Sequence, residues 1–547
     1  MLADCHILLL LGLVMSSQAL LSAFLQLLPQ AYQALAQQQF QPVEHFLQQH
    51  PLDHSQWRAL ALELALARGD TPGAEQLFDG ICCRADEAAG AALRMAQHYL
   101  ALRRRPQCRQ ALAIIARAPI ADAGFYRAVA AVFSGLDDPA QALPWLEQAV
   151  AWAPQHAALR FELALAQFFL NQMDAARANL ALVLETLPLA GNVLHLRSAT
   201  RTATGSDNHI ADLQHRLAQP ALKPQDAVGA GYALAKELED VGQYGAAFAA
   251  LRQAASEKRR QLRYDAASEF ATFAAMRRHF NAEFFAGDNA APHDPATAAL
   301  KPIFILGMPR TGTTLVERIL GQHPEVISIG EFADFPLEVA LAAQQVKGTQ
   351  SLVEAALTLD YAALGQRYLQ QAAAMAQGKP IFIDKLPFNF IYVGLIKKAL
   401  PQARIIHLVR DPLDTCFAIY KTLFNQVYSF SYQLDELADY FIEYKKLMAH
   451  WHQVLPGQIL DVHYEQMVAA PEAQAKRVLD WCDLPWQPDL LAFHQAKSAS
   501  TTASAAQVRQ PVHQKSVQKW RQFATELAPV RERLVAAGLI DANGDPL

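Results

Sequence analysis

The sequence predicts an array of paired helices in its first half and an α/β domain with a parallel sheet in its second half. At 547 residues the chain exceeds what one hydrophobic core usually serves, so two or more domains are expected. Alanine, leucine and glutamine dominate residues 19–278, a composition typical of helices. After residue 300, short apolar runs alternate with helical patterns, as they do in a sheet covered by helices on both faces.

The helical half contains a repeat. Pro154 and Pro188 stand 34 residues apart, which is the period of the tetratricopeptide repeat. Large and small side chains precede both prolines where that repeat packs its two helices: Leu163, Ala164, Ala176 and Leu180 before Pro188, and Tyr126, Ala130, Phe133, Ala142, Leu146 and Ala149 before Pro154. Weaker copies end near Pro119 and cover residues 230–253. Stacked helix pairs form a concave surface that commonly binds peptides, so residues 1–286 are predicted to be a repeat domain that binds a protein partner.

Residues 287–300 are small and polar and contain two prolines, which predicts a linker. Residues 301–547 are then the α/β domain, with strands predicted at 302–306, 379–384, 404–409 and 458–462. Charged or hydroxyl-bearing side chains come soon after each of these strands. Ligands bind at the carboxyl ends of strands in open α/β sheets, so this edge is the predicted site.

The stretch from Gly307 to Thr314 joins the first strand to a helix predicted to begin at Thr313. Its glycines permit a sharp turn, and free N–H groups at a helix start attract anions. It reads G-x-x-x-x-G-T-T, whereas a nucleotide-triphosphatase loop has lysine after the second glycine. Because Arg310 supplies the positive charge instead, the loop favours a terminal phosphate or sulfate over a magnesium-triphosphate. The predicted anion-binding residues are Arg310, Thr311, Gly312, Thr313 and Thr314.

This loop, together with Gly330 and Glu331, resembles the 5′-phosphosulfate loop of the sulfotransferases, and most of all that of the protein-tyrosine sulfotransferases. The whole chain is similar to bacterial proteins that fuse tetratricopeptide repeats to such a domain, and residues 301–520 carry the best match. The resemblance implies a P-loop-like sulfotransferase fold and 3′-phosphoadenosine-5′-phosphosulfate as donor co-substrate. It implies transfer of a sulfuryl group to an acceptor hydroxyl (EC 2.8.2 type), with no metal. A protein tyrosine is one acceptor class; a sugar, lipid or small molecule is the alternative.

The resemblance also assigns roles to single residues. Glu331 matches the general base, Lys385 the lysine that contacts the transferred sulfuryl group, and Ser504 a serine that acts in the transition state. Arg410, which follows a predicted buried strand, matches the arginine that binds the 3′-phosphate. The remaining donor-binding positions are Tyr464, Gln507, Arg509 and Lys519.

Two parts of the sequence depart from the family pattern. Ala418 stands where the family usually has serine, and Thr422 where the tyrosine sulfotransferases have arginine; Tyr420 or Lys421 are the candidates to compensate. After Glu331 the animal tyrosine sulfotransferases continue with glutamate, threonine and arginine, which help to hold an acidic peptide. Here residues 332–334 are phenylalanine, alanine and aspartate, so a tyrosine acceptor does not follow from the sequence.

Composition narrows the other possibilities. A net charge of −5 argues against a nucleic-acid binder. The six cysteines lack zinc spacing, and adjacent Cys82 and Cys83 make a poor disulfide framework, which favours a reducing compartment. The histidines of the first half have no partners at metal-ligand spacing. His407 lies inside a predicted strand and is predicted to be a core residue.

The N-terminus has more than one interpretation. Residues 7–28 are largely apolar, which makes a membrane anchor one alternative, but no lysine or arginine precedes the run. A start at Met15, with a helix over residues 19–28 capped by Ser16 or Ser17, is another interpretation, and the choice between Met1 and Met15 stays open. A cytoplasmic protein is the favoured prediction.

Two other classes of function are alternatives to a sulfotransferase. One is a P-loop nucleoside or nucleotide kinase, which Thr313 in place of lysine opposes. The other is a repeat scaffold with an inactive domain, which the alanine at position 418 permits.

Overall fold

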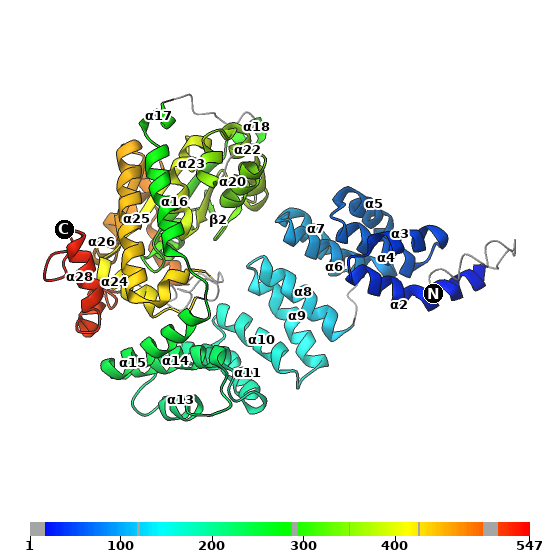
Figure 1. The fold of residues 1–547 in the computed structure, drawn as a ribbon, viewed down its shortest axis with the longest axis horizontal. Coiled ribbons are helices and arrows are strands. Elements are labelled where there is room, and N and C mark those ends of the chain that lie inside the picture. The colour runs from blue at the N-terminus through cyan, green and yellow to red at the C-terminus, as the bar shows by residue number, and fades with distance from the viewer. Residues whose placement is uncertain (1–16, 118–120, 287–293, 349–350, 425–426, 496–511) are drawn as a thin grey trace. The chain divides into compact units, whose positions relative to one another are not determined.

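The computed structural model describes residues 17–117, 121–286, 294–348, 351–424, 427–495 and 512–547 (Figure 1). The chain divides into two compact units, Met1–Leu136 and Asp137–Leu547. None of the described helices combines the length and the apolar character that crossing a membrane requires.

The first unit is helical throughout its described residues. Its core includes Phe24, Phe46 and Leu60, which are fully or almost fully buried. The rings of Phe24 and Phe46 stack with their centroids 5.2 Å apart. Asp70 caps the N-terminus of α5 by accepting a hydrogen bond from the Gly73 N–H at 3.0 Å. The helices are α2 (Ser17–Ala36), α3 (Phe40–Gln49), α4 (Ser55–Ala67), α5 (Thr71–Cys82), α6 (Ala85–Ala101), α7 (Arg105–Ile115) and α8 (Ala123–Gly135).

The second unit begins with more paired helices. Ala164, Ala176 and Leu180, three of the predicted repeat positions, are fully buried where α10 and α11 pack together, which confirms the repeat pattern. The pair predicted over residues 230–253 is also present, as α14 and α15. The helices of this region are α9 (Pro139–Trp152), α10 (Ala157–Phe169), α11 (Met173–Thr186), α12 (Gly191–Ala199), α13 (Ile210–Leu217), α14 (Pro224–Asp240), α15 (Tyr244–Arg260), α16 (Ala266–His279) and α17 (Ala282–Phe285).

A five-stranded parallel sheet follows, in the order β2-β3-β1-β4-β5. Its strands are β1 (Lys301–Gly307), β2 (Val326–Ser328), β3 (Ile381–Lys385), β4 (Arg404–Val409) and β5 (Ile459–His463). The four predicted strands are confirmed within two residues. The three-residue β2 was not predicted, because it is too short to show a hydrophobic pattern.

Alternating residues of the sheet face two apolar cores. Ile303 and Ile305 of β1 pack with α19 and α27, whereas Phe304 and Leu306 face the larger core that includes α22, α23 and α25. The elements around the sheet are α18 (Pro295–Ala298), α19 (Thr313–Leu320), α20 (Asp334–Gln344), α21 (Leu352–Ala356), α22 (Tyr361–Met375), the 3-10 helix η1 (Pro387–Tyr392), α23 (Val393–Ala399), α24 (Pro412–Tyr420), η2 (Ser429–Tyr432), α25 (Leu434–Val454), α26 (Tyr464–Ala469), α27 (Pro471–Trp481), η3 (Pro488–Gln495), η5 (Lys519–Phe523) and α28 (Ala528–Ala536).

Helices α14 to α16 pack directly on the sheet domain and share its larger core. Helix α16 lies beside α25 (Figure 1), where the rings of Phe273 and Tyr440 meet at 5.7 Å. Two ion pairs join this region to α25: Arg259 of α15 pairs with Glu436 at 2.7 Å, and Arg277 of α16 pairs with Glu443 at 2.9 Å. The linker predicted over residues 287–300 is described only from residue 294 onward, and the boundaries at 286 and 301 stay a prediction.

Candidate active site

The carboxyl edge of the sheet carries one predicted functional residue or loop after each strand. Glu331 follows β2, Lys385 ends β3, the loop at 308–312 follows β1, Arg410 follows β4, and Tyr464 follows β5. The register of the strands aligns their carboxyl ends: Ile305 of β1 pairs with Lys385 of β3, and Gly307 of β1 pairs with Leu408 of β4. The topology therefore brings these side chains to one edge, as the sequence predicts.

The loop after β1 has a backbone that its glycines make possible. Gly307 has φ +140°, and a Cβ there would lie 2.7 Å from the Leu408 carbonyl oxygen. Gly312 has φ +100° and caps α19, and its Cβ would lie 2.7 Å from the Tyr464 ring. Arg310 also has positive φ, at 68°, an uncommon conformation for a non-glycine residue that clusters at binding sites. The loop thus holds a costly shape in which α19 starts directly at the ligand edge.

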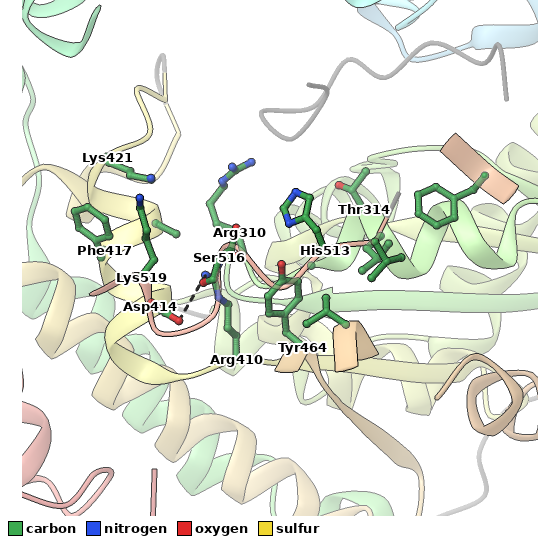
Figure 2. A pocket seen from close by; sticks show the side chains of 16 residues that line it. Arg310, Thr314, Arg410, Asp414, Phe417, Lys421, Tyr464, His513, Ser516 and Lys519 are labelled. Atoms are coloured by element: carbon green, nitrogen blue, oxygen red, sulfur yellow. Dashed lines mark hydrogen bonds and ion pairs between the residues drawn. The ribbon is translucent and has the colours of Figure 1, made fainter. Parts of the chain in front are cut away.

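Most of the described donor-binding candidates line one pocket at this loop (Figure 2). Thr313 is buried nearby, and the Thr311 hydroxyl donates to the Met308 carbonyl at 2.7 Å, so Thr311 shapes the turn. Ser504, Gln507 and Arg509 lie outside the described residues. The lining is Arg310, Gly312, Thr314, Leu315, Arg410, Asp414, Phe417, Ala418, Lys421, Tyr464, Val468, Phe493, Val512, His513, Ser516 and Lys519.

Arg410 connects the loop to the C-terminal segment. Its guanidinium donates to the Arg310 carbonyl at 2.9 Å and to the Ser516 carbonyl at 2.6 Å. It also lies 4.8 Å from the centre of the Tyr464 ring and 3.8 Å from Asp414. Burial, together with the neighbouring Arg410 charge, lowers the pKa of Arg310 to about 10. Both arginines line the same pocket, and their combined positive charge favours an anionic ligand there.

Asp414 is a structural residue of the pocket that the sequence reasoning missed. Its carboxylate accepts hydrogen bonds from the Gln518 N–H at 2.6 Å and the Trp520 N–H at 2.9 Å, which fixes the C-terminal segment against α24. Its position four residues after Arg410, one helical turn away, is the sequence feature that could have indicated a place in the same pocket. His513 and Ser516 also line the pocket, but they lie in a segment without hydrophobic periodicity, so no local signal marks them.

Position 418 places a methyl group in the pocket wall where the resemblance expects a serine hydroxyl. The Thr422 hydroxyl donates to the Ala418 carbonyl at 2.8 Å and so completes the helix end. Tyr420 is buried against Phe248, with ring centroids 5.9 Å apart. Of the two residues expected to compensate, Lys421 is the one in the described pocket lining.

Glu331 and Lys385 form an ion pair on the β2 and β3 side of the edge. The Lys385 ammonium, whose side chain is 1% exposed, donates to Glu331 Oε1 at 2.5 Å and lies 3.8 Å from Glu317 Oε2. The Glu331 side chain is 42% exposed. Neither residue of the pair is in the described lining of the pocket. The geometry gives an accessible carboxylate that can accept a proton beside a buried, fixed cation.

His407 is 1% exposed, which confirms the prediction that it is a core residue. It is also part of a polar network. Its Nδ1 lies 2.7 Å from Asp461 Oδ1, its Nε2 contacts the Tyr444 hydroxyl, and His452 Nε2 lies 3.0 Å from the same Asp461 oxygen. His407, His452 and Asp461 form a group within the described chain whose ligand atoms are close enough to hold a metal, although hydrogen bonds account for each contact.

Comparison with known proteins finds similar sequences for both parts of the chain. Residues 302–488 match the sulfotransferase family, and residues 135–199 match the tetratricopeptide repeat. An uncharacterized protein of Aquifex aeolicus is 34% identical over 339 residues, 60% of this chain and 44% of that protein. Protein-tyrosine sulfotransferase A of Caenorhabditis elegans is 27% identical over 239 residues, 40% of this chain and 60% of that protein. The chain thus spans about half the length of these curated relatives. Among solved structures, the sulfotransferase domain from the curacin biosynthetic pathway aligns over 43% of this chain and 98% of its own, with 17% identity and a TM-score of 0.31.

Proposed function

Since the chain carries a sulfotransferase domain together with a tetratricopeptide repeat, we propose that it transfers a sulfuryl group from 3′-phosphoadenosine-5′-phosphosulfate to an acceptor hydroxyl. The observation that carries this proposal is the charge of the pocket at the start of α19. Its described lining contains four cationic side chains, Arg310, Arg410, Lys421 and Lys519, and one carboxylate, Asp414. Such an excess of positive charge suits a ligand with several anionic groups.

The donor would bind with its phosphosulfate at the N–H groups and hydroxyls where α19 begins. Thr314 lines the pocket there, and Arg310 adds positive charge. Phe417 and Phe493 supply apolar wall for the nucleoside. Arg410 holds the Arg310 carbonyl and so positions the loop that the anion contacts.

In the reaction, the acceptor oxygen attacks sulfur while the bond from sulfur to the phosphate oxygen breaks, which releases adenosine 3′,5′-bisphosphate. We assign Glu331 as the base that takes the acceptor proton, because it is an accessible carboxylate at the same sheet edge. Lys385 and Arg310 would stabilise negative charge on the transferring group and the leaving oxygen. Ser504 stays a predicted contributor to the same step.

The chemical class of the acceptor is the open part of this proposal. The relatives named protein-tyrosine sulfotransferases support a tyrosine. However, Phe332 is 1% exposed and Asp334 3% exposed, so the two largest side chains after Glu331 turn into the core. Any recognition of an acidic peptide must then come from other residues. The helical repeats are the proposed surface that presents a protein acceptor, because such arrays commonly bind peptides.

A labelled-donor assay tests the proposed function. The full chain is incubated with sulfur-labelled donor and a panel of tyrosine peptides, sugars, lipids and small phenols, and the labelled product is identified. In parallel, adenosine 3′,5′-bisphosphate should raise the melting temperature more than AMP or ATP does, since a ligand stabilises the state that binds it. Magnesium-ATP turnover without sulfuryl transfer would favour a kinase, and no response to the bisphosphate would favour an inactive scaffold.

A truncation tests the proposed role of the repeats. The protein 137–547 retains the whole second unit and its shared core, so it should fold and bind adenosine 3′,5′-bisphosphate as the full chain does. If the first unit helps to hold a protein acceptor, transfer to that protein should fall while transfer to a small acceptor stays unchanged. Equal loss on both acceptors, or no loss on either, would contradict this role.

A further inference from the structure

A carboxylate from the helical region contacts two lysines of the donor pocket. Glu239 lies in the last turn of α14, and its Oε1 is 2.8 Å from the Lys421 ammonium and 3.3 Å from that of Lys519. Both lysines line the pocket, one directly after α24 and the other at the start of η5. Residues 224–240 thus contribute charge to a site that the sequence assigns to residues 301–547 alone.

The surroundings make this contact strong and leave the site positive. The side chains of Glu239, Lys421 and Lys519 are 17, 31 and 25% exposed. Lys421 lies 5.1 Å from the centre of the Phe417 ring. Burial lowers the pKa of Lys421, and Lys519 and Arg310 lower it further, while Glu239 opposes this shift. Two lysines therefore share one carboxylate at this end of the pocket, and Figure 2 shows their amino groups close to each other.

The carboxylate itself is held in an unfavourable place. Burial raises the pKa of Glu239, yet Lys421 and Lys519 outweigh burial and keep that pKa below its ordinary value. A negative charge in the last turn of a helix also opposes the helix dipole. The ion pairs with the two lysines are thus the main interactions that hold the Glu239 carboxylate in place. An anion with more charge could displace this carboxylate from the two ammonium groups.

From this geometry we infer that Lys421 and Lys519 form a phosphate subsite, which the Glu239 carboxylate fills until a phosphate monoester displaces it. A phosphate dianion carries more charge and more acceptor oxygens than a carboxylate, so it binds two ammonium groups better. The inference rests on the proposed function: the phosphate would be the 3′-phosphate of the donor, which the resemblance assigns to Arg410, and Lys421 and Lys519 line the same pocket as that arginine. It explains how the pocket works with alanine at position 418, because Lys421 lies one turn further along the chain from that methyl group. It also makes α14 a part of the donor site.

Calorimetric titration of the full chain tests the inference. Glu239→Gln removes the competing charge and should bind adenosine 3′,5′-bisphosphate roughly 5-fold more tightly. Lys421→Met should bind it roughly 10-fold more weakly. AMP, which lacks the 3′-phosphate, should bind all three proteins alike. Glu436→Gln is the matched control: Glu436 pairs with Arg259 across the same two regions but is not in the described pocket lining, so it should alter stability without altering affinity for the bisphosphate.

Each outcome decides the question. If Glu239→Gln leaves the affinity for the bisphosphate unchanged or weakens it, Glu239 only ties α14 to the sheet domain and the inference is wrong. If Glu239→Gln does not fold, unchanged affinity in Lys421→Met overturns the inference in the same way, and weakened affinity supports it. If the wild-type protein does not prefer the bisphosphate to AMP, the proposed donor is wrong. Inorganic phosphate then tests the subsite alone, since it should raise the melting temperature of Glu239→Gln more than that of the wild type; an equal rise overturns the inference.

Discussion

The two halves of the sheet edge treat charge in opposite ways. On the β2 and β3 half, the buried Lys385 ammonium lies between two carboxylates, Glu331 at 2.5 Å and Glu317 at 3.8 Å. On the β1, β4 and β5 half, Arg410 gives two hydrogen bonds to the main-chain carbonyls of Arg310 and Ser516, which carry no net charge, and lies 3.8 Å from one carboxylate, Asp414. On the first half, carboxylates fully offset the cation, whereas the pocket on the second half has more cationic side chains than carboxylates.

Under the proposed function, this difference would let one sheet edge serve two substrates. A donor with several negative charges needs uncompensated cations, which a protein can hold in place through carbonyl oxygens. An acceptor hydroxyl is neutral until it loses its proton, so its half needs a base and a fixed cation in balance. If the two halves divide the work in this way, substitutions on each half should affect different steps of the reaction.

The largest effect is expected on the balanced half. Glu331→Gln keeps the shape of the side chain but removes its ability to accept a proton. If Glu331 is the base, the single-turnover rate of sulfuryl transfer should fall roughly 10² to 10⁴-fold, with donor affinity little changed. Rapid-quench measurement with saturating donor gives the rate, and titration with adenosine 3′,5′-bisphosphate gives the affinity.

Glu338→Gln is a suitable control for that experiment. Glu338 also pairs with a cation, Arg367 at 2.7 Å, but on the helices α20 and α22. Its loss should leave the rate unchanged. A Glu331→Gln protein that is active but melts at a lower temperature would show that Glu331 only pairs with Lys385, and the division of the edge would fail on this half.

A smaller effect is expected on the positive half. Arg310→Ala should weaken binding of adenosine 3′,5′-bisphosphate roughly 10- to 100-fold and should also slow transfer, because this charge acts in the ground state and in the transition state. Arg404→Ala is the matched control. Arg404 begins the same strand that Arg410 follows, so it lies at the opposite edge of the sheet, where it pairs with Asp483. Equal losses in both variants would mean that the total charge of the protein, and not the pocket, attracts the donor.

The smallest effect concerns pH. Burial raises the pKa of Asp411, which caps α24, to about 7, well above the value near 4 expected when the chain is unfolded. The folded protein therefore loses stability as pH rises from about 4 to 7, where the unfolded state loses this proton first. Asp411→Asn keeps a capping oxygen and should raise the melting temperature by roughly 1–3 °C at pH 8, with almost no change at pH 4. A rise of equal size at both values would point to packing and not to the charge of Asp411.

Local patterns were enough to predict the strands that position the site. Strands β1 and β4 are apolar runs bounded by a charged residue or a glycine loop, and the side chains that follow them, Arg310 and Arg410, are found in the pocket. The base candidate Glu331 and its neighbour Lys385 could be placed at the same edge for the same reason, because parallel strands end together.

The residues that escaped prediction act across long stretches of the chain. Asp414 binds N–H groups more than a hundred residues later, and Glu239 contacts a lysine 182 residues later. Neither contact leaves a periodic trace, because each depends on how α14, α24 and the C-terminal segment pack together. In the sequence alone, Glu239 and Asp414 are charged residues near the end and the start of a helix, where such residues are common.

The link between Arg410 and Ser516 means that the pocket is completed late in the synthesis of the chain. This hydrogen bond and that from Trp520 to Asp414 each span 106 residues. A chain growing from its N-terminus would form the repeats and all five strands before the segment that completes the pocket has left the ribosome. Under the proposed function, a nascent chain that ends before residue 512 lacks this link, so we expect it to bind adenosine 3′,5′-bisphosphate more weakly than the full chain does.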